Sequence, residues 1–233
     1  MPSSKRDGSR EPASELPKGW PGRGAAWVFA YGSLMWDPGF AHAEHAPARI
    51  YGFHRRFCVY SHLYRGTPER PGLVLGLDRG GSCHGLALRI PRSELPAVLD
   101  YLWRREMLTR VYHPRLIAAR LDRGRAVPAL AFVVNRAHRQ YAGGLTPVQT
   151  AALVLQGHGG RGPCRDYLGN TLRHLSDLGL ADRGLSRLES LVEGLCAGRL
   201  ETPTLPPPPP PEPVVLNASS LNWANRQAAP AGK

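Results

Sequence analysis

The sequence predicts an α+β fold in which a strand-rich first half is followed by a helical second half. Between residues 27 and 134, stretches of β-branched and aromatic side chains alternate with turns rich in Gly and Pro, which is typical of strands. Between residues 146 and 197, apolar residues recur at the spacing of helices. A single helical pattern, at residues 93–106, interrupts the strands. The elements therefore do not follow the alternating βαβ order of a parallel sheet.

The first predicted strand ends in a turn that is the candidate binding loop. Val28, Phe29 and Tyr31 belong to the residue types that pack well on a pleated sheet. The strand breaks at Gly32-Ser33, where the chain can turn sharply and expose backbone N–H groups. Such groups at a strand end can bind an anionic part of a substrate. The alternative is that this turn only changes the direction of the chain.

Further strands are predicted by alternating or apolar patterns. They cover Ala48–Ser61 (one strand or a bent pair), Leu73–Leu77, His84–Ile90, Arg115–Leu121 and Ala129–Val134. We expect residues 79–82, Arg-Gly-Gly-Ser, to form a turn that joins the two short strands on either side. Within residues 48–61, we expect Arg55-Arg56 to form a solvated edge, the alternative being that one of them points inward to an anion.

The pattern at residues 93–106 predicts the clearest helix. Ser93 is the expected N-cap, and Pro96 lies in the first turn, where its missing N–H costs nothing. The expected buried stripe consists of Leu95, Val98, Leu99 and Leu102. Four residues further along the same stripe lies Glu106, whereas Arg104 and Arg105 fall on other faces and can remain solvated.

A carboxylate at the end of an apolar stripe has two interpretations. Burial raises the pKa of a carboxyl group and costs several kcal/mol unless the group is partnered. Glu106 could therefore be a structural residue, paired with an Arg or exposed at a frayed helix end. It could also be a general base with a raised pKa, held on a rigid element.

The second half of the chain is predicted to be helical up to a proline-rich tail. Helices are expected at Thr146–Gln156, capped by Thr146, and at Pro163–Leu178 and Leu185–Ala197. Six prolines, Pro206–Pro211, then predict a polyproline II rod that no helix or central strand can include. Residues 201–233 are therefore assigned to a C-terminal tail, of which Leu216, Leu221 and Trp223 either pack back or remain disordered. Residues 1–24, which are polar and rich in Ser, Pro, Gly and Arg, are expected to be a disordered N-terminal tail.

Composition limits the class of protein. A chain of 233 residues can form one substantial core or two small ones, and no apolar run reaches the roughly 18 residues that suggest a membrane helix. The four cysteines are widely separated without a C-x-x-C pair, which disfavours a zinc ribbon or a disulfide framework and favours free thiols in the cytosol. His42 and His45 lack a third metal ligand at a suitable spacing, so a loop is expected there.

The net charge of +12 would suit nucleic-acid binding, but its distribution does not. The 27 arginines and 3 lysines are spread along the chain, with no nucleic-acid-binding motif and no element that interleaves basic and aromatic residues. We therefore expect no nucleic-acid partner, although the charge could steer a small anionic substrate.

Four segments together resemble the ChaC family of γ-glutamylcyclotransferases. They are the stretch from Val28 to Trp36, Arg55-Arg56-Phe57, the stretch from Arg65 to Gly72, and Arg105-Glu106. The resemblance extends from about Trp27 to Leu180. The Tyr-Gly-Ser-Leu turn alone is shared with related cyclotransferase-like proteins, so the order and spacing of all four segments carry the assignment.

The resemblance implies a small mixed β-barrel with flanking helices, formed by a catalytic domain at residues 25–200. It also implies cleavage of glutathione into 5-oxoproline and cysteinylglycine in the cytoplasm, with no metal or organic cofactor. By the same resemblance, Glu106 is the proton acceptor, and the substrate-binding residues are Val28, Phe29, Ala30, Tyr31, Gly32, Ser33 and Tyr167. The family often has Gly where this chain has Ala30, which would be strained if the backbone there needed a positive φ.

The residues fit this chemistry, but two other functions remain open. The α-amine of the substrate attacks its own γ-amide carbonyl, so no enzyme nucleophile is required. Ser33 has neither a Gly-x-Ser-x-Gly elbow nor an evident base, and we expect it to bind substrate. One alternative is a cyclotransferase acting on other γ-glutamyl amines. The other is a basic binding protein without catalysis, whose binding would weaken with salt.

Overall fold

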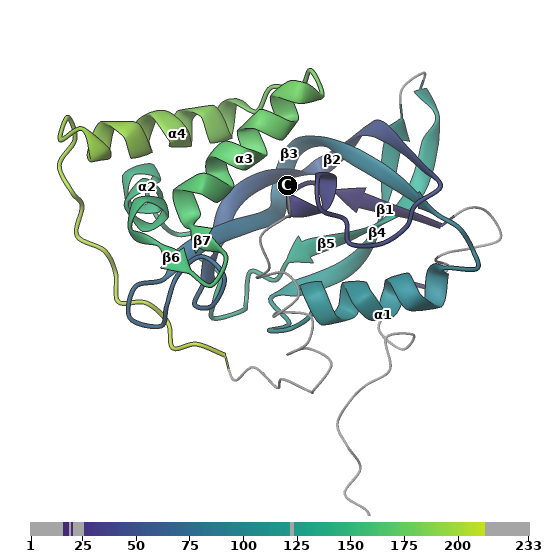
Figure 1. The fold of residues 1–233 in the computed structure, drawn as a ribbon, viewed down its shortest axis with the longest axis horizontal. Coiled ribbons are helices and arrows are strands. Elements are labelled where there is room, and N and C mark those ends of the chain that lie inside the picture. Colours follow the sequence, from purple (N-terminus) through teal and green to yellow (C-terminus); the bar gives the residue numbers. More distant parts are fainter. Residues whose placement is uncertain (1–15, 19, 21–25, 122–123, 213–233) are drawn as a thin grey trace, which may run out of the picture.

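The computed structural model describes residues 16–18, 20, 26–121 and 124–212. Five strands form a closed barrel in the order β1-β3-β2-β4-β5 (Figure 1). They are β1 (Ala26–Ala30), β2 (Glu44–Ser61), β3 (Gly72–Ile90), β4 (Tyr112–Leu121) and β5 (Ala126–Val134). Antiparallel pairs make up most of the barrel, and the parallel pairing of β1 with β5 closes it. The predicted small mixed barrel is confirmed.

Strand β3 is continuous where two short strands were expected. The expected turn at residues 79–82 is wrong because Gly80 and Gly81 adopt positive φ within the strand, at 102° and 68°. Opposite them on β2, Gly52 has a φ of 81°, and the register shifts between the pairs Tyr51–Ser82 and Phe53–Arg79. Glycine tolerates these dihedral angles, so both long strands bend together and the ladder continues.

Helix α1 (Leu95–Glu106) lies against the barrel with the predicted stripe facing inward. Val98 and Leu102 are buried, and they share an apolar cluster with Val28 and Ala30 of β1. The expected cap at Ser93 is wrong: Glu94 is the N-cap residue and no side chain caps the helix. A backbone turn leads into the helix instead, in which the Glu94 N–H donates to the Pro91 carbonyl (3.0 Å).

Three helices cover the other side of the barrel: α2 (Pro147–Gln156), α3 (Cys164–Asp177) and α4 (Arg183–Cys196) (Figure 1). A two-residue hairpin, β6 (His158–Gly159) and β7 (Gly162–Pro163), connects α2 to α3. The predicted cap Thr146 is confirmed, since its side chain accepts a hydrogen bond from the Gln149 N–H in a capping box. These helices share their core with the barrel interior, to which β1 contributes Trp27 and Phe29.

Arg55 links the barrel to α4, and its expected place at a solvated edge is wrong. Its side chain is 1% exposed, and Nη1 contacts Asp182 Oδ2 at 2.8 Å. Asp182 also caps α4 by accepting the Leu185 N–H (3.1 Å). The neighbouring Arg56 side chain, which points to the other face of β2, is 32% exposed. An alternating strand must place one of two consecutive arginines inward, and here the carboxylate of Asp182 balances the inward charge.

The described part of the C-terminal tail, residues 201–212, is extended and returns along α2 toward the barrel (Figure 1, yellow). Leu205 packs against the main core, and Gln149 Nε2 donates to the Thr204 carbonyl (2.9 Å). The other predictions for the tails lie outside the described residues: most of residues 1–24, and the packing or disorder of Leu216, Leu221 and Trp223.

Candidate active site

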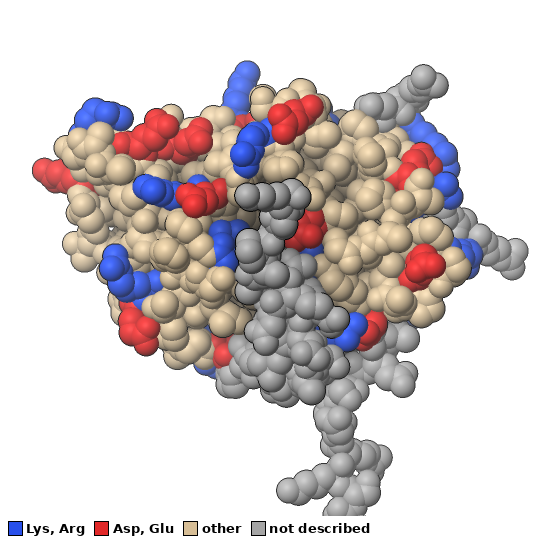
Figure 2. Space-filling model, viewed as in Figure 1, with Lys and Arg blue, Asp and Glu red and all other residues tan. Residues whose placement is uncertain are grey.

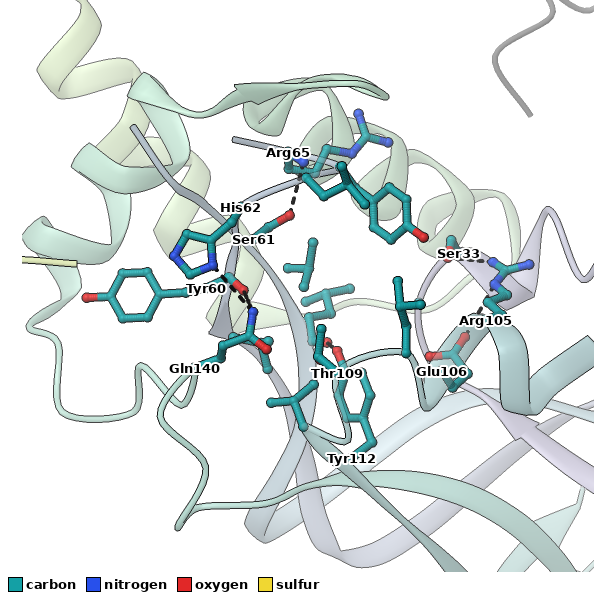
Figure 3. A pocket seen from close by; sticks show the side chains of 18 of the residues that line it. Ser33, Tyr60, Ser61, His62, Arg65, Arg105, Glu106, Thr109, Tyr112 and Gln140 are labelled. Atoms are coloured by element: carbon teal, nitrogen blue, oxygen red, sulfur yellow. Dashed lines mark hydrogen bonds and ion pairs between the residues drawn. The ribbon is translucent and has the colours of Figure 1, made fainter. Parts of the chain in front are cut away.

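A cavity of about 270 Å³ opens where the end of β1, the end of α1, the α3 helix and the C-terminal tail meet (Figure 3). Tyr31, Gly32 and Ser33 from the turn after β1 line it, as do Glu106 from α1 and Tyr167 from α3. The structure thus brings together five of the eight residues predicted for the site. The other three, Val28, Phe29 and Ala30, are fully buried within β1 and face the two cores.

The turn after β1 is held from several directions. Tyr31 donates its hydroxyl to the Phe132 carbonyl (2.9 Å), and Arg55 Nε donates to the Tyr31 carbonyl. Gly32 is closely approached, because a Cβ there would meet Tyr167 Oη at 3.1 Å. Gly32 has a φ of −137°, so the requirement for glycine is one of space and not of dihedral angle. This packing keeps the turn rigid beside the cavity.

Ala30 is accommodated in the ordinary extended backbone of β1. Among the described residues, Arg110 is the one non-glycine residue with a positive φ, so Ala30 does not need the freedom of a glycine. The backbone strain considered for Ala30 therefore does not arise.

Glu106 ends α1 with its carboxylate directed into the cavity (Figure 3). Its side chain is 17% exposed, and Oε1 lies 3.3 Å from Arg105 Nε. Burial raises the pKa of Glu106, while the positive charges of Arg105 and Arg161 lower it by a smaller amount. The carboxyl group is therefore both paired, as the structural interpretation requires, and of raised pKa, as a general base requires.

Arg105 is a central residue of the site that the sequence pattern placed in solvent. It is 8% exposed, and it donates to Ser33 Oγ (2.8 Å), the Asp37 carbonyl (2.7 Å) and the Tyr101 hydroxyl (2.8 Å). The prediction is wrong because the chain between β1 and β2 covers this face of α1 and supplies acceptors for the guanidinium. Helical periodicity describes only the side facing the barrel and contains no information about a covering loop.

Tyr167 and Arg65 form another wall of the cavity. The Arg65 guanidinium lies over the Tyr167 ring, 5.1 Å from its centroid, and the Phe57 ring contacts Tyr167 edge-on at 5.6 Å. Burial raises the pKa of Tyr167 to about 12, so its hydroxyl keeps its proton at neutral pH. Sequence reasoning used residues 65–72 as a segment of the family resemblance but did not predict Arg65 as a lining residue. The signal available was the resemblance of this segment to the family.

The opposite side of the cavity carries Tyr60, His62 and Gln140 (Figure 3). Gln140 Nε2 donates to the Tyr60 carbonyl (3.2 Å), and the Tyr60 N–H donates to the Gln140 carbonyl (2.9 Å). The last two described residues of the tail, Pro211 and Glu212, complete the lining. Sequence reasoning gave no indication that these segments would meet.

Basic side chains outnumber acidic ones in the cavity. Arg65, Arg105 and Arg161 line it together with Glu106 and Glu212. By contrast, on the face shown in Figure 2 the described Lys and Arg side chains are scattered among acidic ones. The concentration of guanidinium groups inside the cavity suits a small anionic ligand.

Neither a metal cluster nor a membrane helix occurs in the part of the chain that the structure describes. No group of three or more His, Cys, Asp or Glu side chains could hold a metal ion among these residues. The rings of His42 and His45 lie 5.7 Å apart. Within residues 16–18, 20, 26–121 and 124–212, every helix is too short or too polar to cross a membrane.

Comparisons with known proteins agree with this architecture. The model of the ChaC-like protein family matches residues 26–195. A glutathione-specific γ-glutamylcyclotransferase of Escherichia coli K12 is 36% identical over 80% of this chain and 81% of that protein. A human glutathione-specific γ-glutamylcyclotransferase 1 is 29% identical, over 75% of this chain and 76% of its own length.

The fold is shared with a solved structure. The crystal structure of a glutathione-specific γ-glutamylcyclotransferase from yeast superposes with a TM-score of 0.68 at 22% identity. The match covers 72% of this chain and 96% of the yeast chain. With the family model spanning the whole barrel and the helices around it, the chain belongs to the ChaC-like family.

Proposed function

We propose that this chain is a glutathione-specific γ-glutamylcyclotransferase that converts glutathione into 5-oxoproline and cysteinylglycine. The observation that carries the proposal is the half-buried carboxylate of Glu106, which has a raised pKa and lies in one cavity with the Tyr31-Gly32-Ser33 turn. The substrates named for the relatives in Escherichia coli and human support glutathione as the compound cleaved.

The reaction needs a group that moves one proton from the attacking to the leaving nitrogen. The α-ammonium group of bound glutathione first loses one proton to solvent, because only the neutral amine can attack the γ-carbonyl carbon. As the amine attacks, its nitrogen gives a second proton to Glu106. A new N–C bond closes the five-membered ring, and the C–N bond to the cysteine breaks. Glu106 then returns the proton to the cysteinylglycine amine. A raised pKa brings Glu106 closer to the operating pH, which makes both transfers easier, and the reaction consumes no water.

Ser33 and Arg105 are assigned to binding and orientation. Ser33 Oγ receives a hydrogen bond from Arg105 Nη2 at 2.8 Å, and a guanidinium cannot accept a proton from a serine. Ser33 therefore has a donor where a nucleophile would need a base. Arg105 also forms an ion pair with Glu106 Oε1 and so fixes the position of the proposed base relative to the turn.

The arginines of the cavity suit the charge of the substrate. Glutathione carries two carboxylates and one ammonium group at neutral pH, so it enters as an anion. Arg65, which lies over the Tyr167 ring, and the turn at Gly32-Ser33 both line the cavity, and each can bind one carboxylate. We assign the enzyme to the cytoplasm, in agreement with the free thiols of Cys58, Cys83 and Cys164, and expect no nucleic-acid partner.

The test is to incubate the purified protein with glutathione and to follow 5-oxoproline and cysteinylglycine by mass spectrometry. We expect both products from the unaltered chain, and a loss of about 10²- to 10⁴-fold in kcat for Glu106→Gln, the range typical of a general base. Glu193→Gln, an exposed glutamate on α4, is the matched control and should retain full activity.

The outcomes separate the proposal from its alternatives. Near-normal turnover by Glu106→Gln would overturn the assignment of the base. If the unaltered chain did not cleave glutathione but cyclised γ-glutamyl dipeptides, the function would be that of a cyclotransferase with other substrates. Inactivity toward every γ-glutamyl compound would leave a non-catalytic binding protein.

A further inference from the structure

We infer that residues 201–212, which we call the tail strap, form the end wall of the subsite for the cysteinylglycine half of the substrate, and that Glu212 latches this wall in place. The inference rests on the proposed function and adds a part of the chain that follows the family match, which ends at residue 195. Pro211 and Glu212 line the same cavity as Glu106.

The tail strap is fastened at both ends. At its start, Leu205 packs against the core and Gln149 Nε2 donates to the Thr204 carbonyl (2.9 Å). At its end, Glu212 Oε1 lies 2.9 Å from Arg139 Nε and 3.5 Å from His138 Nε2. The Glu212 side chain is 20% exposed and the Arg139 side chain is 53% exposed, so the latch is a part-exposed ion pair.

The prolines between the two fastenings make the tail strap stiff. A polyproline II helix has three residues per turn, so Pro209 and Glu212 face the same side. Both are half-buried, whereas Pro208, Pro210 and Pro211 between and before them are exposed. Pro209 reaches His62: burial lowers the pKa of His62, and a contact with the Pro209 backbone opposes that change. The tail strap therefore rests on the cavity wall along one defined face.

The chemistry decides which half of the substrate this wall meets. The attacked carbonyl must lie beside Glu106, and the glutamyl half folds into a compact five-membered ring there. The cysteinylglycine half is the longer one and must extend away from Glu106. Figure 3 places Tyr60, His62 and Gln140 across the cavity from Ser33, Arg105 and Glu106. The tail strap lies on the side of Tyr60, His62 and Gln140, because the Pro209 backbone contacts His62.

Gln140 offers a specific contact in that half. Its Nε2 donates to the Tyr60 carbonyl, and this hydrogen bond fixes the orientation of the side-chain amide. The other polar atom of the amide, Oε1, is therefore the acceptor that remains. Gln140 is 5% exposed, and its Oε1 is buried without a hydrogen-bond partner among the described residues. A buried acceptor without a partner is costly. The amide N–H between cysteine and glycine is a donor of the kind that would satisfy it.

The first experiment compares steady-state kinetics on glutathione and on γ-glutamyl-cysteinyl-glycyl-glycine, a peptide one residue longer. Glu212→Gln removes the charge of the latch and keeps its size. We expect KM for glutathione to rise about two- to fivefold, because the loss of a part-exposed ion pair weakens binding by about this factor. We expect kcat to be nearly unchanged. The kcat/KM for the longer peptide, divided by that for glutathione, should rise, because an end wall that is no longer held in place can make room for the extra glycine.

Two further variants identify the latch. Arg139→Gln should reproduce most of the effect of Glu212→Gln, and the double variant should add nothing to Glu212→Gln, because the contact that Arg139→Gln breaks is already lost when Glu212 is replaced. Glu193→Gln, which changes an exposed acid on α4 outside the tail strap, is the matched control and should behave as the unaltered chain. If Glu212→Gln matched Glu193→Gln on both substrates, the tail strap would not be a wall of the subsite.

The contact with Gln140 has its own probe, the ester analogue of glutathione in which oxygen replaces the Cys–Gly amide N–H. The unaltered chain should cleave it with a kcat/KM at least about fivefold below that of glutathione, because Oε1 would remain unsatisfied. Equal cleavage would overturn this contact. Failure of the unaltered chain to cleave glutathione at all would instead overturn the proposed function, and the subsite with it, which is a result distinct from the others.

Discussion

Two carboxylates, the buried Asp78 on β3 and the half-buried Glu106 at the end of α1, have pKa values that move in opposite directions. Burial raises the pKa of Asp78 too, but hydrogen bonds from Arg136 (2.6 Å), Tyr141 (2.8 Å) and the Arg79 N–H (2.8 Å) outweigh burial, and the net shift is downward. At Glu106, burial outweighs the attraction of Arg105 and Arg161, and the net shift is upward.

The difference lies in the number of donors directed at each group. Asp78 is fully buried on β3 and accepts hydrogen bonds from a strand, a loop tyrosine and an arginine, so its charge is stabilised in place. Glu106 faces an open cavity with one ion pair at 3.3 Å. A carboxylate that is saturated with donors is a structural group, whereas one that is desolvated with few donors is able to exchange a proton.

The largest expected effect on stability comes from Asp78→Asn. The change would leave Tyr141 and Arg136 facing a neutral amide. Because the Arg136 side chain is 48% exposed, the loss is that of hydrogen bonds to a charged group, about 1.5–3 kcal/mol. We expect the loss in the free energy of unfolding, measured by urea denaturation at pH 7. The turnover per folded molecule should stay unchanged, and a fall in kcat with normal stability would contradict the structural role.

A smaller effect of the opposite sign is expected for Glu106→Gln. The folded-state pKa of Glu106 is raised, so its contribution to stability is fully present below its unfolded pKa of about 4.3 and is lost as pH rises through the folded value. At pH 7 to 8 the neutral Gln should therefore be the more stable variant, with a gain in Tm of about 2–4 °C for each kcal/mol.

The pH dependence of that gain provides its control. The difference in Tm between Glu106→Gln and the unaltered chain should shrink toward pH 4, where Glu106 is neutral in both states. Asp78 should show the opposite pH dependence. Because its pKa is lowered in the folded state, its contribution to the free energy of unfolding is present above its unfolded pKa of about 3.9 and is lost as pH falls through the folded value. A lower Tm for Glu106→Gln at pH 8 would contradict the raised pKa of Glu106.

The parts of the fold that sequence could predict are those set by local pattern. The stripe of α1 led to Glu106, and the Thr146 cap with Pro147 located α2, because helical periodicity and capping depend on residues close in the sequence. The strand and turn at residues 28–33 followed from residue type in the same way. The closed barrel itself came from the resemblance to the family, since local patterns do not specify which strands pair.

The residues that sequence reasoning misplaced depend on partners far along the chain. Arg55 is buried because Asp182, 127 residues later, reaches it. Arg105 is buried because Asp37 and Ser33, about 70 residues earlier, surround its guanidinium. The wall formed by Gln140 and Glu212 joins segments that no periodicity relates. Such contacts arise from the topology, so the position of the candidate base Glu106 could be predicted, whereas the residues that support it and the far end of the cavity could not.

The most direct test of the account is a titration of the two carboxyl groups by NMR on protein labelled with ¹³C at the carboxyl carbons of Asp and Glu. Spectra of Glu106→Gln and Asp78→Asn would identify the two resonances. We expect Glu106 to titrate above the ordinary value of about 4.3, and Asp78 below its ordinary value of about 3.9. A Glu106 carboxyl that titrated at or below the ordinary value would contradict its role as the group that carries the proton.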